Sequence, residues 1–188
     1  NAPQERTPLP AALPPVYAPI EEALDVLFAQ QFGANGGKFV YCIHQQELIE
    51  QLQLLTVQRK WQHLYCAEPI LQEALADLPL TTAVDDLLAL PVSLTTCEAL
   101  IARTGTVCLS SQTASGRQWS IVPPVHIVVA TTNQLVYELR DVLALHDRTT
   151  MPSMLCFAST NSRTADIEKT LVNGAHGPKE LFVFLLDN

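Results

Sequence analysis

The sequence lacks any apolar stretch approaching the roughly 18 uninterrupted residues that a membrane-spanning helix needs, and no charged and then apolar signal segment opens it. These two absences predict a soluble protein without a membrane span, and the cytoplasm is its expected location. The chain has 188 residues, of which 48% are hydrophobic. That is enough to bury one substantial core, so a single domain is the default.

Cysteine is scarce and scattered, with five residues that lie mostly in apolar runs (Cys42, Cys66, Cys97, Cys108 and Cys156). A zinc or iron–sulfur site requires paired or clustered Cys and His ligands, and a disulfide framework requires a smaller chain with denser cysteines. The cysteines are therefore predicted to be buried thiols, and we expect this chain to bind no metal and no cofactor itself. A Gly-rich dinucleotide fingerprint is also absent.

Positive charge is in short supply in the first part of the chain. Residues 1–100 hold 4 Lys and Arg against 12 Asp and Glu, whereas residues 101–188 hold 7 of each, and the net charge is −8. Binding a phosphate backbone requires a basic face, so we expect no nucleic-acid partner. The acidic part is interpreted as a solvated helical surface, while the neutral second part can still attract a small anion.

The chain does contain a regular alternation of helix-period and strand-like segments. A Pro-rich lead over 1–19 is predicted to be extended and partly loose, and an α/β domain is predicted over 20–188. In the first part of that domain we expect helices over 20–32, 45–58 and 69–77, strands over 38–43 and 63–66, and short strands near Thr82 and Val92.

The second part is richer in strands. We expect a short helix over 96–102 capped by Thr95 or Thr96, strands over 106–110, 119–122, 125–130, 153–158 and 181–186, a polar loop over 112–117, a helix that Asn133 caps and that ends at 145, and a helix over 165–172. The continuous apolar run 125–130 is typical of a strand covered on both faces, which predicts the centre of the sheet there. The fold class is α/β with a mostly parallel sheet flanked by helices, and antiparallel pairing is expected around 106–130.

The densest group of polar and turn residues lies over 159–178, between two apolar segments. An α/β protein normally places a ligand site outside its strand ends, so this stretch is the first candidate. Ser162 or Thr164 can cap the next helix and Asp166 complements its dipole, which needs no ligand, whereas Arg163 is a candidate carboxylate or phosphate receptor. His176, beside Gly177, lies in a loop that no helix or strand period requires, and we assign it to a ligand or a partner.

Two earlier candidates have both a functional and a structural interpretation. The turn Thr104-Gly105-Thr106 can present N–H groups and hydroxyls to an anion, or it can be a turn whose glycine needs a positive φ. His126, in the apolar strand, is either an acid–base group or a buried imidazole bonded to a neighbour.

Three segments together resemble the lactate utilization protein C family, the LUD domain: Ala102-Arg103-Thr104-Gly105-Thr106, then Pro123-Pro124-Val125-His126-Ile127-Val128-Val129, then 162–168 followed by 174–178. The resemblance covers roughly residues 95–188. It implies a fold similar to the sugar-phosphate isomerase and CoA-transferase superfamily. It also implies a part in oxidising L-lactate to pyruvate, together with an iron–sulfur oxidoreductase and an iron–sulfur cluster-binding protein as partners.

Arg103 departs from the family pattern, in which Ala-Glu-Thr-Gly-Thr is common. If that carboxylate performs acid–base or nucleophilic work, this chain lacks it, and Arg103 instead favours an anionic ligand. No catalytic residue is assigned. The candidate ligand-binding residues are Arg103, Thr104, Gly105, Thr106, His126, Ser162, Arg163, Thr164, Asp166, His176 and Gly177.

Two functions follow from these patterns. The first is an assisting subunit of a lactate-oxidising system that binds a small anion, with the iron–sulfur clusters held by its partner subunits. The alternative is a stand-alone enzyme of the sugar-phosphate isomerase or CoA-transferase kind, in which Arg103, Arg163 and His176 receive the anion.

Overall fold

The computed structural model describes residues 22–82, 89–115, 119–147, 149–160, 163–164, 172–173 and 177–188. Its largest element is a sheet of six parallel strands, here called sheet A, in the order β1-β12-β7-β4-β2-β3. In chain order these strands are β1 (Lys38–Cys42), β2 (Leu64–Tyr65), β3 (Leu80–Thr81), β4 (Val92–Thr95), β7 (Val125–Thr131) and β12 (Glu180–Leu186). The α/β class with a mostly parallel sheet is confirmed.

The strand β7 lies inside sheet A, between β12 and β4, as its apolar sequence predicts. Six of its seven residues are buried, because helices cover one face of the sheet and a second sheet covers the other. Neighbouring residues of β7 face opposite layers, so Ile127 packs toward the helices and Val128 toward the second sheet.

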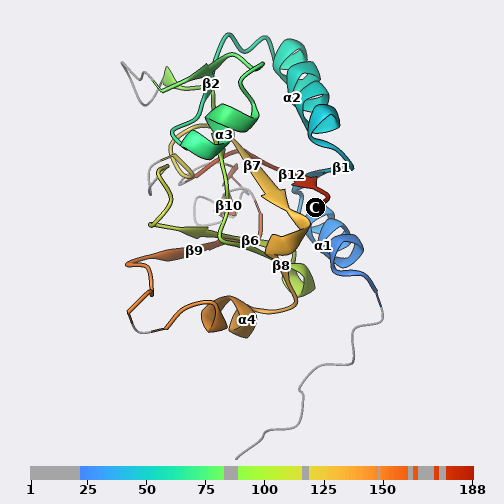
Figure 1. The fold of residues 1–188 in the computed structure, drawn as a ribbon, viewed down its shortest axis with the longest axis vertical. Helices are drawn as coiled ribbons and strands as arrows, with labels where there is room; N and C mark the ends of the chain where they lie inside the picture. The colour runs from blue at the N-terminus through green and yellow to red at the C-terminus, as the bar shows by residue number, and fades with distance from the viewer. Residues whose placement is uncertain are drawn as a thin grey trace, which may run out of the picture.

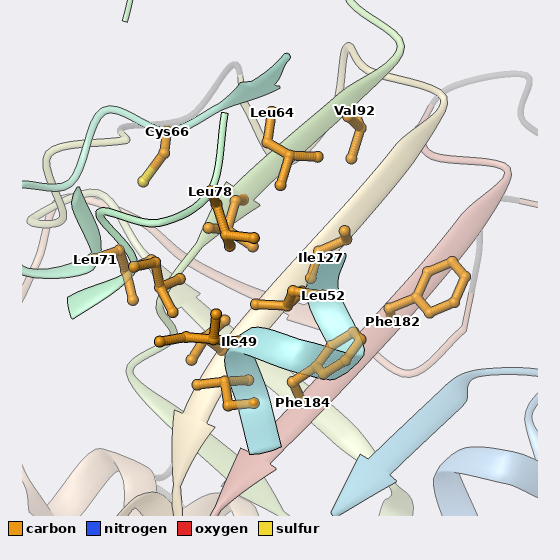
Figure 2. Packing of buried hydrophobic residues seen from close by; sticks show 14 of the residues in the cluster. Ile49, Leu52, Leu64, Cys66, Leu71, Leu78, Val92, Ile127, Phe182 and Phe184 are labelled. Carbon is orange, nitrogen blue, oxygen red and sulfur yellow. The ribbon is translucent and has the colours of Figure 1, made fainter. Parts of the chain in front are cut away.

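The helices α2 (Gln45–Arg59) and α3 (Pro69–Ala74) cover the first face of sheet A (Figure 1). Figure 2 shows Ile49 and Leu52 of α2 and Leu71 of α3 pointing into one apolar cluster with strand residues such as Ile127 and Phe184. The recurrence of buried residues every three to four positions in α2 is what makes this segment an amphipathic helix.

The opposite face of sheet A packs against α1 (Leu24–Ala34) and a four-stranded sheet, here called sheet B, in the order β8-β5-β6-β9. Its strands are β5 (Ala99–Ile101), β6 (Thr106–Ser110), β8 (Leu135–Val136) and β9 (Leu155–Ala158), and β6 runs antiparallel to β5 and β9. The helix α4 (Leu139–Ala144) covers the far face of sheet B through Val142 (Figure 1). The expected antiparallel pairing around 106–130 therefore involves β6.

Two predicted helices are wrong at sheet B. The segment expected as a helix over 96–102 forms β5 and then the 3-10 turn η2 (Ala102–Thr104), because its apolar residues are buried between β6 and β8. The segment expected as one helix from Asn133 to 145 is divided into the 3-10 turn η3 (Thr132–Gln134), then β8 and then α4. Thr131 and Gln134 form a capping box around η3, so Asn133 is not the cap.

Two further expectations need correction. The strand expected over 119–122 is a series of turns, in which the carbonyl of Trp119 accepts a hydrogen bond from Ser93 and the ring stacks on Tyr65. Arg163 and Thr164 form the short strand β10 (Arg163–Thr164), which pairs antiparallel with β11 (Val172–Asn173). The predicted helix therefore does not include Val172. Its other residues, 165–171, lie outside the described residues, so the capping role of Thr164 stays a prediction, and the lead over 1–19 lies outside them as well.

The cysteines agree with the prediction of buried thiols. All five are free, four are buried, and burial raises the pKa of Cys42 and Cys66 to about 11. In the described part of the chain, no helix is long and apolar enough to cross a membrane.

Candidate functional site

The turn Thr104-Gly105-Thr106 joins η2 to β6 and packs on the end of α1. Gly105 has a φ of 57°, in the left-handed region that favours glycine. A Cβ atom at this position would lie 2.2 Å from the backbone nitrogen of Phe32. The backbone conformation and the close approach of α1 both require glycine at position 105, so packing alone is sufficient to explain this residue.

The hydroxyls of this turn belong to a partly buried group that we call the turn cluster: Thr104, Thr106, Ser159 and Asn35. The Oγ1 of Thr106 lies 2.7 Å from the Oγ1 of Thr104 and 2.7 Å from the Oγ of Ser159. Asn35 donates from Nδ2 to the carbonyl of Thr104 at 2.9 Å. The fold thus brings the Thr-Gly-Thr turn to Ser159, the first residue of the polar stretch that the sequence singled out.

Arg103 lies beside the turn but faces a different partner. Its Nε is 3.9 Å from the Oε2 of Glu138, whose carboxylate also contacts the Nε of Arg140. Glu138 is buried at the start of α4, where a capping box with Asp141 fixes its backbone. Any anion that binds to Arg103 has to compete with this carboxylate.

His126 is enclosed in the protein, with 1% of its surface exposed. Burial lowers its pKa to about 4, so the ring is neutral at pH 7. Its Nε2 lies 2.8 Å from the Oγ1 of Thr95, which in turn donates to the carbonyl of Thr96. Because the only hydroxyl proton of Thr95 goes to that carbonyl, Nε2 is the donor toward Thr95. This geometry fits the buried imidazole of the two interpretations.

The other sequence candidates lie in the last part of the chain. Ser162, Asp166 and His176 are outside the described residues, and Arg163 and Thr164 are described only through their pairing in β10. Gly177 opens the described segment that leads into β12. Their roles in ligand binding stay predictions.

A second buried polar group, which sequence reasoning missed, centres on Glu68 between β2 and α3. Its Oε2 accepts a hydrogen bond from the backbone N–H of Thr96 at 3.0 Å and another from the Thr96 hydroxyl, and its Oε1 accepts one from the Ser115 hydroxyl at 2.6 Å. Glu68 is 3% exposed, so these three donors replace water around the carboxylate. We call Glu68, Thr96, Ser115, Thr95 and His126 the edge cluster.

Glu68 and Thr96 of the edge cluster lie at the edge of sheet A where parallel strands end, whereas His126 is the second residue of β7 and pairs with Ser93 of β4. Glu68 follows β2 and Thr96 follows β4, and the carboxyl ends of parallel strands are where open α/β sheets bind ligands. A sequence signal existed: an acidic residue two positions after a short predicted strand and directly before the proline that opens a helix. Its partners, 28 and 47 residues away along the chain, could not be read from local spacing.

A cavity of about 470 Å³ opens at the same edge, between α2 and α3. Thr96 of the edge cluster contributes to its wall, and so do Val129, Ala130 and Thr131 at the end of β7. No group of three or more His, Cys, Asp or Glu side chains suited to a metal ion occurs among the described residues. This edge of sheet A thus combines a hydrogen-bonded carboxylate with a largely apolar cavity wall.

A family model described as the LUD domain matches residues 82–186, more than half of the chain. Among curated proteins, the chain is 36% identical over 97 residues to Lactate utilization protein C of Deinococcus radiodurans. The alignment covers 50% of this chain and 45% of that protein. It is 31% identical over 102 residues to the protein of the same name from Bacillus subtilis, covering 51% and 42%. An uncharacterized protein of Neisseria meningitidis is 38% identical over 88 residues, covering 46% and 38%. The alignments thus span less than half the length of these relatives.

One solved structure is also similar. The crystal structure of a DUF162 family protein from Deinococcus radiodurans matches with a TM-score of 0.63 at 19% sequence identity, covering 87% of this chain and 96% of that chain. At this identity the match establishes a shared fold and nothing about ligands.

Proposed function

Because the chain belongs to the LUD domain family, we propose that it acts in lactate utilization, as an assisting subunit of a system that oxidises L-lactate to pyruvate. The observation that carries the proposal is the match to relatives named Lactate utilization protein C, at 30–36% identity over about half of this chain.

The proposal assigns the iron–sulfur clusters to partner subunits, an iron–sulfur oxidoreductase and an iron–sulfur cluster-binding protein. Oxidising lactate to pyruvate removes two electrons and two protons, so the system needs groups that accept electrons. The cysteines of this chain are divided among three clusters of the core, and burial raises the pKa of their thiols, which disfavours the thiolate form that binds an iron–sulfur cluster.

Within that system the chain is proposed to bind a small anion through Arg163 and His176. Arg103 is less suited to the task, because Glu138 already lies beside its guanidinium group. Ser159 belongs to the turn cluster, and it is also the first residue of the polar stretch 159–178 that carries Arg163.

Affinity purification of the tagged protein from its native cells grown on L-lactate tests the proposal. We expect iron–sulfur proteins to co-purify and the eluate to oxidise lactate. A lone protein without associated activity would contradict the subunit role, and turnover of sugar phosphates or acyl-CoA compounds by that lone protein would support the stand-alone enzyme instead.

Complementation of a deletion strain tests the anion site. Arg163→Ala and His176→Ala are expected to slow growth on lactate while the protein remains folded, whereas Gln53→Ala, on an exposed position of α2, leaves growth unchanged. Normal growth with both site variants would reject these two residues as functional.

A further inference from the structure

The cavity at the carboxyl edge of sheet A has the form of a small-molecule site. Its volume of about 470 Å³ lies in the range of ligand pockets, roughly 300–1,000 Å³. It is bounded by two layers of the fold, the helices α2 and α3 on one side and the ends of the central strands on the other. Much of its wall is apolar, formed by Leu48, Ile70, Leu71, Leu75, Val129 and Leu186.

The charge of the wall limits the ligand. None of the described residues that line the cavity carries a formal charge. A carboxylate or phosphate entering it would lose hydration without gaining a cation, which is strongly unfavourable. Lactate itself is therefore a poor ligand for this cavity, and a neutral molecule with an apolar body suits it.

The polar atoms of the wall set a second condition, because both protons of Thr96 and one amide proton each of Gln45 and Gln134 are already used. Thr96 gives both its N–H and its hydroxyl proton to Glu68. Gln45 donates from Nε2 to the carbonyl of Ala74 at 2.7 Å, and Gln134 donates from Nε2 to the carbonyl of Cys97 at 2.6 Å. What Thr96 retains for a ligand is the acceptor capacity of its hydroxyl oxygen, so the ligand has to supply the proton.

We propose that this cavity binds a neutral organic molecule with an apolar, ring-sized body and a hydroxyl or N–H group that donates to the Oγ1 of Thr96. Glu68 orients that oxygen by accepting the hydroxyl proton of Thr96. The inference goes beyond the proposed function and does not depend on it, because it rests on the cavity and the edge cluster alone.

Three matched probes test the proposal on the full chain at pH 7: 1-naphthol, which has a donor; 1-methoxynaphthalene, whose donor is capped; and 1-naphthoate, an anion. Fluorescence and calorimetric titration follow binding. We expect saturable binding of 1-naphthol, binding of the methoxy compound about fivefold weaker because one hydrogen bond is lost, and no saturable binding of the anion.

Two substitutions of alanine by phenylalanine locate the site. Ala74→Phe projects a ring from α3 into the cavity and is expected to weaken 1-naphthol binding at least tenfold. Ala29→Phe, in the separate depression between α1 and β1, is the control and leaves binding unchanged. Thr96→Val removes the acceptor and is expected to abolish the preference for 1-naphthol over its methoxy analogue.

Three results would overturn the proposal: no saturable binding of 1-naphthol to the wild-type protein, equally tight binding of 1-naphthoate, or a preference for 1-naphthol that survives in Thr96→Val. Circular dichroism establishes that each variant is folded. If Ala74→Phe does not fold, the probe preference in Thr96→Val decides the question.

Discussion

The turn cluster and the edge cluster are both hydrogen-bonded groups, but the edge cluster is the more deeply buried and the two differ in chemistry. The turn cluster contains hydroxyls and an amide around a glycine that touches the backbone of α1. The edge cluster contains a carboxylate and an imidazole, and its Thr96 also lines a cavity. Burial lowers the pKa of the His126 imidazole, so the edge cluster is expected to respond to pH, whereas the turn cluster joins the Thr-Gly-Thr turn to the end of α1 and to Ser159.

Among the changes that test this comparison, Gly105→Ala is expected to lower the free energy of unfolding most. The left-handed backbone and the approach to Phe32 each penalise a Cβ atom, and together they should lower the free energy of unfolding by about 4 kcal/mol. Urea denaturation measures the loss. Gly33→Ala is the control, because no atom lies within 4 Å of its added Cβ atom and the position is inside α1, where alanine stabilises by about 0.5–1 kcal/mol. Equal stability of the two variants would contradict the close packing of Gly105 against the backbone of α1.

Acid is expected to destabilise the edge cluster through His126. Its pKa falls from 6.5 to about 4 on folding, so between these values the unfolded chain binds a proton that the folded chain does not. Stability is therefore complete above pH 6.5 and decreases as the pH falls toward 4, by about 3 kcal/mol in total.

Urea midpoints measured from pH 7 to pH 4.5 check this expectation. His126→Gln should flatten the profile, while His63→Gln, at an exposed position, should not. Glu180 and Asp147 have lowered pKa values, and their stabilising effects are lost only at lower pH, so they do not account for a slope above pH 4.5. A profile unchanged by His126→Gln would show that the ring is not held neutral.

Glu68→Ala is expected to lower the free energy of unfolding by about 2 kcal/mol. The change leaves the Thr96 N–H and the Ser115 hydroxyl without their buried acceptor, and bonds to a charged group contribute more than neutral ones. Glu68→Gln should lose about half as much, since its amide oxygen still accepts from Thr96 while the Ser115 hydroxyl turns to accept. Chemical denaturation of both variants at pH 7 measures the difference, and a stable Glu68→Ala variant would contradict the role given to the carboxylate.

Sheet A and α2 could be predicted from the sequence because each carries its own period. The apolar run of β7 and the helical spacing of α2 are local patterns that the buried faces enforce. Sheet B could not, because β5 and β8 are three and two residues long and owe their conformation to strands elsewhere in the chain. The sequence of 133–145 fits one continuous helix as well as it fits the observed turn, strand and short helix.

The site was predictable only where a motif is contiguous. Thr104-Gly105-Thr106 stands out by its spacing, but its glycine is explained by Phe32, far away along the chain. Glu68 is a single acidic residue whose significance comes from Thr96 and Ser115, which the fold brings to it. Long-range contacts of this kind decide whether a polar residue is structural or part of a site.

Thr106→Val is the mildest change and the sharpest test of the turn cluster. Valine keeps the shape of threonine in β6 and removes the hydroxyl shared by Thr104 and Ser159, so the expected loss is about 1 kcal/mol. Ser159→Ala should cost a similar amount, and the double variant less than the sum, because both single changes remove the same hydrogen bond. Additive losses in urea denaturation would mean that the two hydroxyls act independently. In that case the Thr-Gly-Thr turn and the polar stretch would be neighbours without a stabilising hydrogen bond between them.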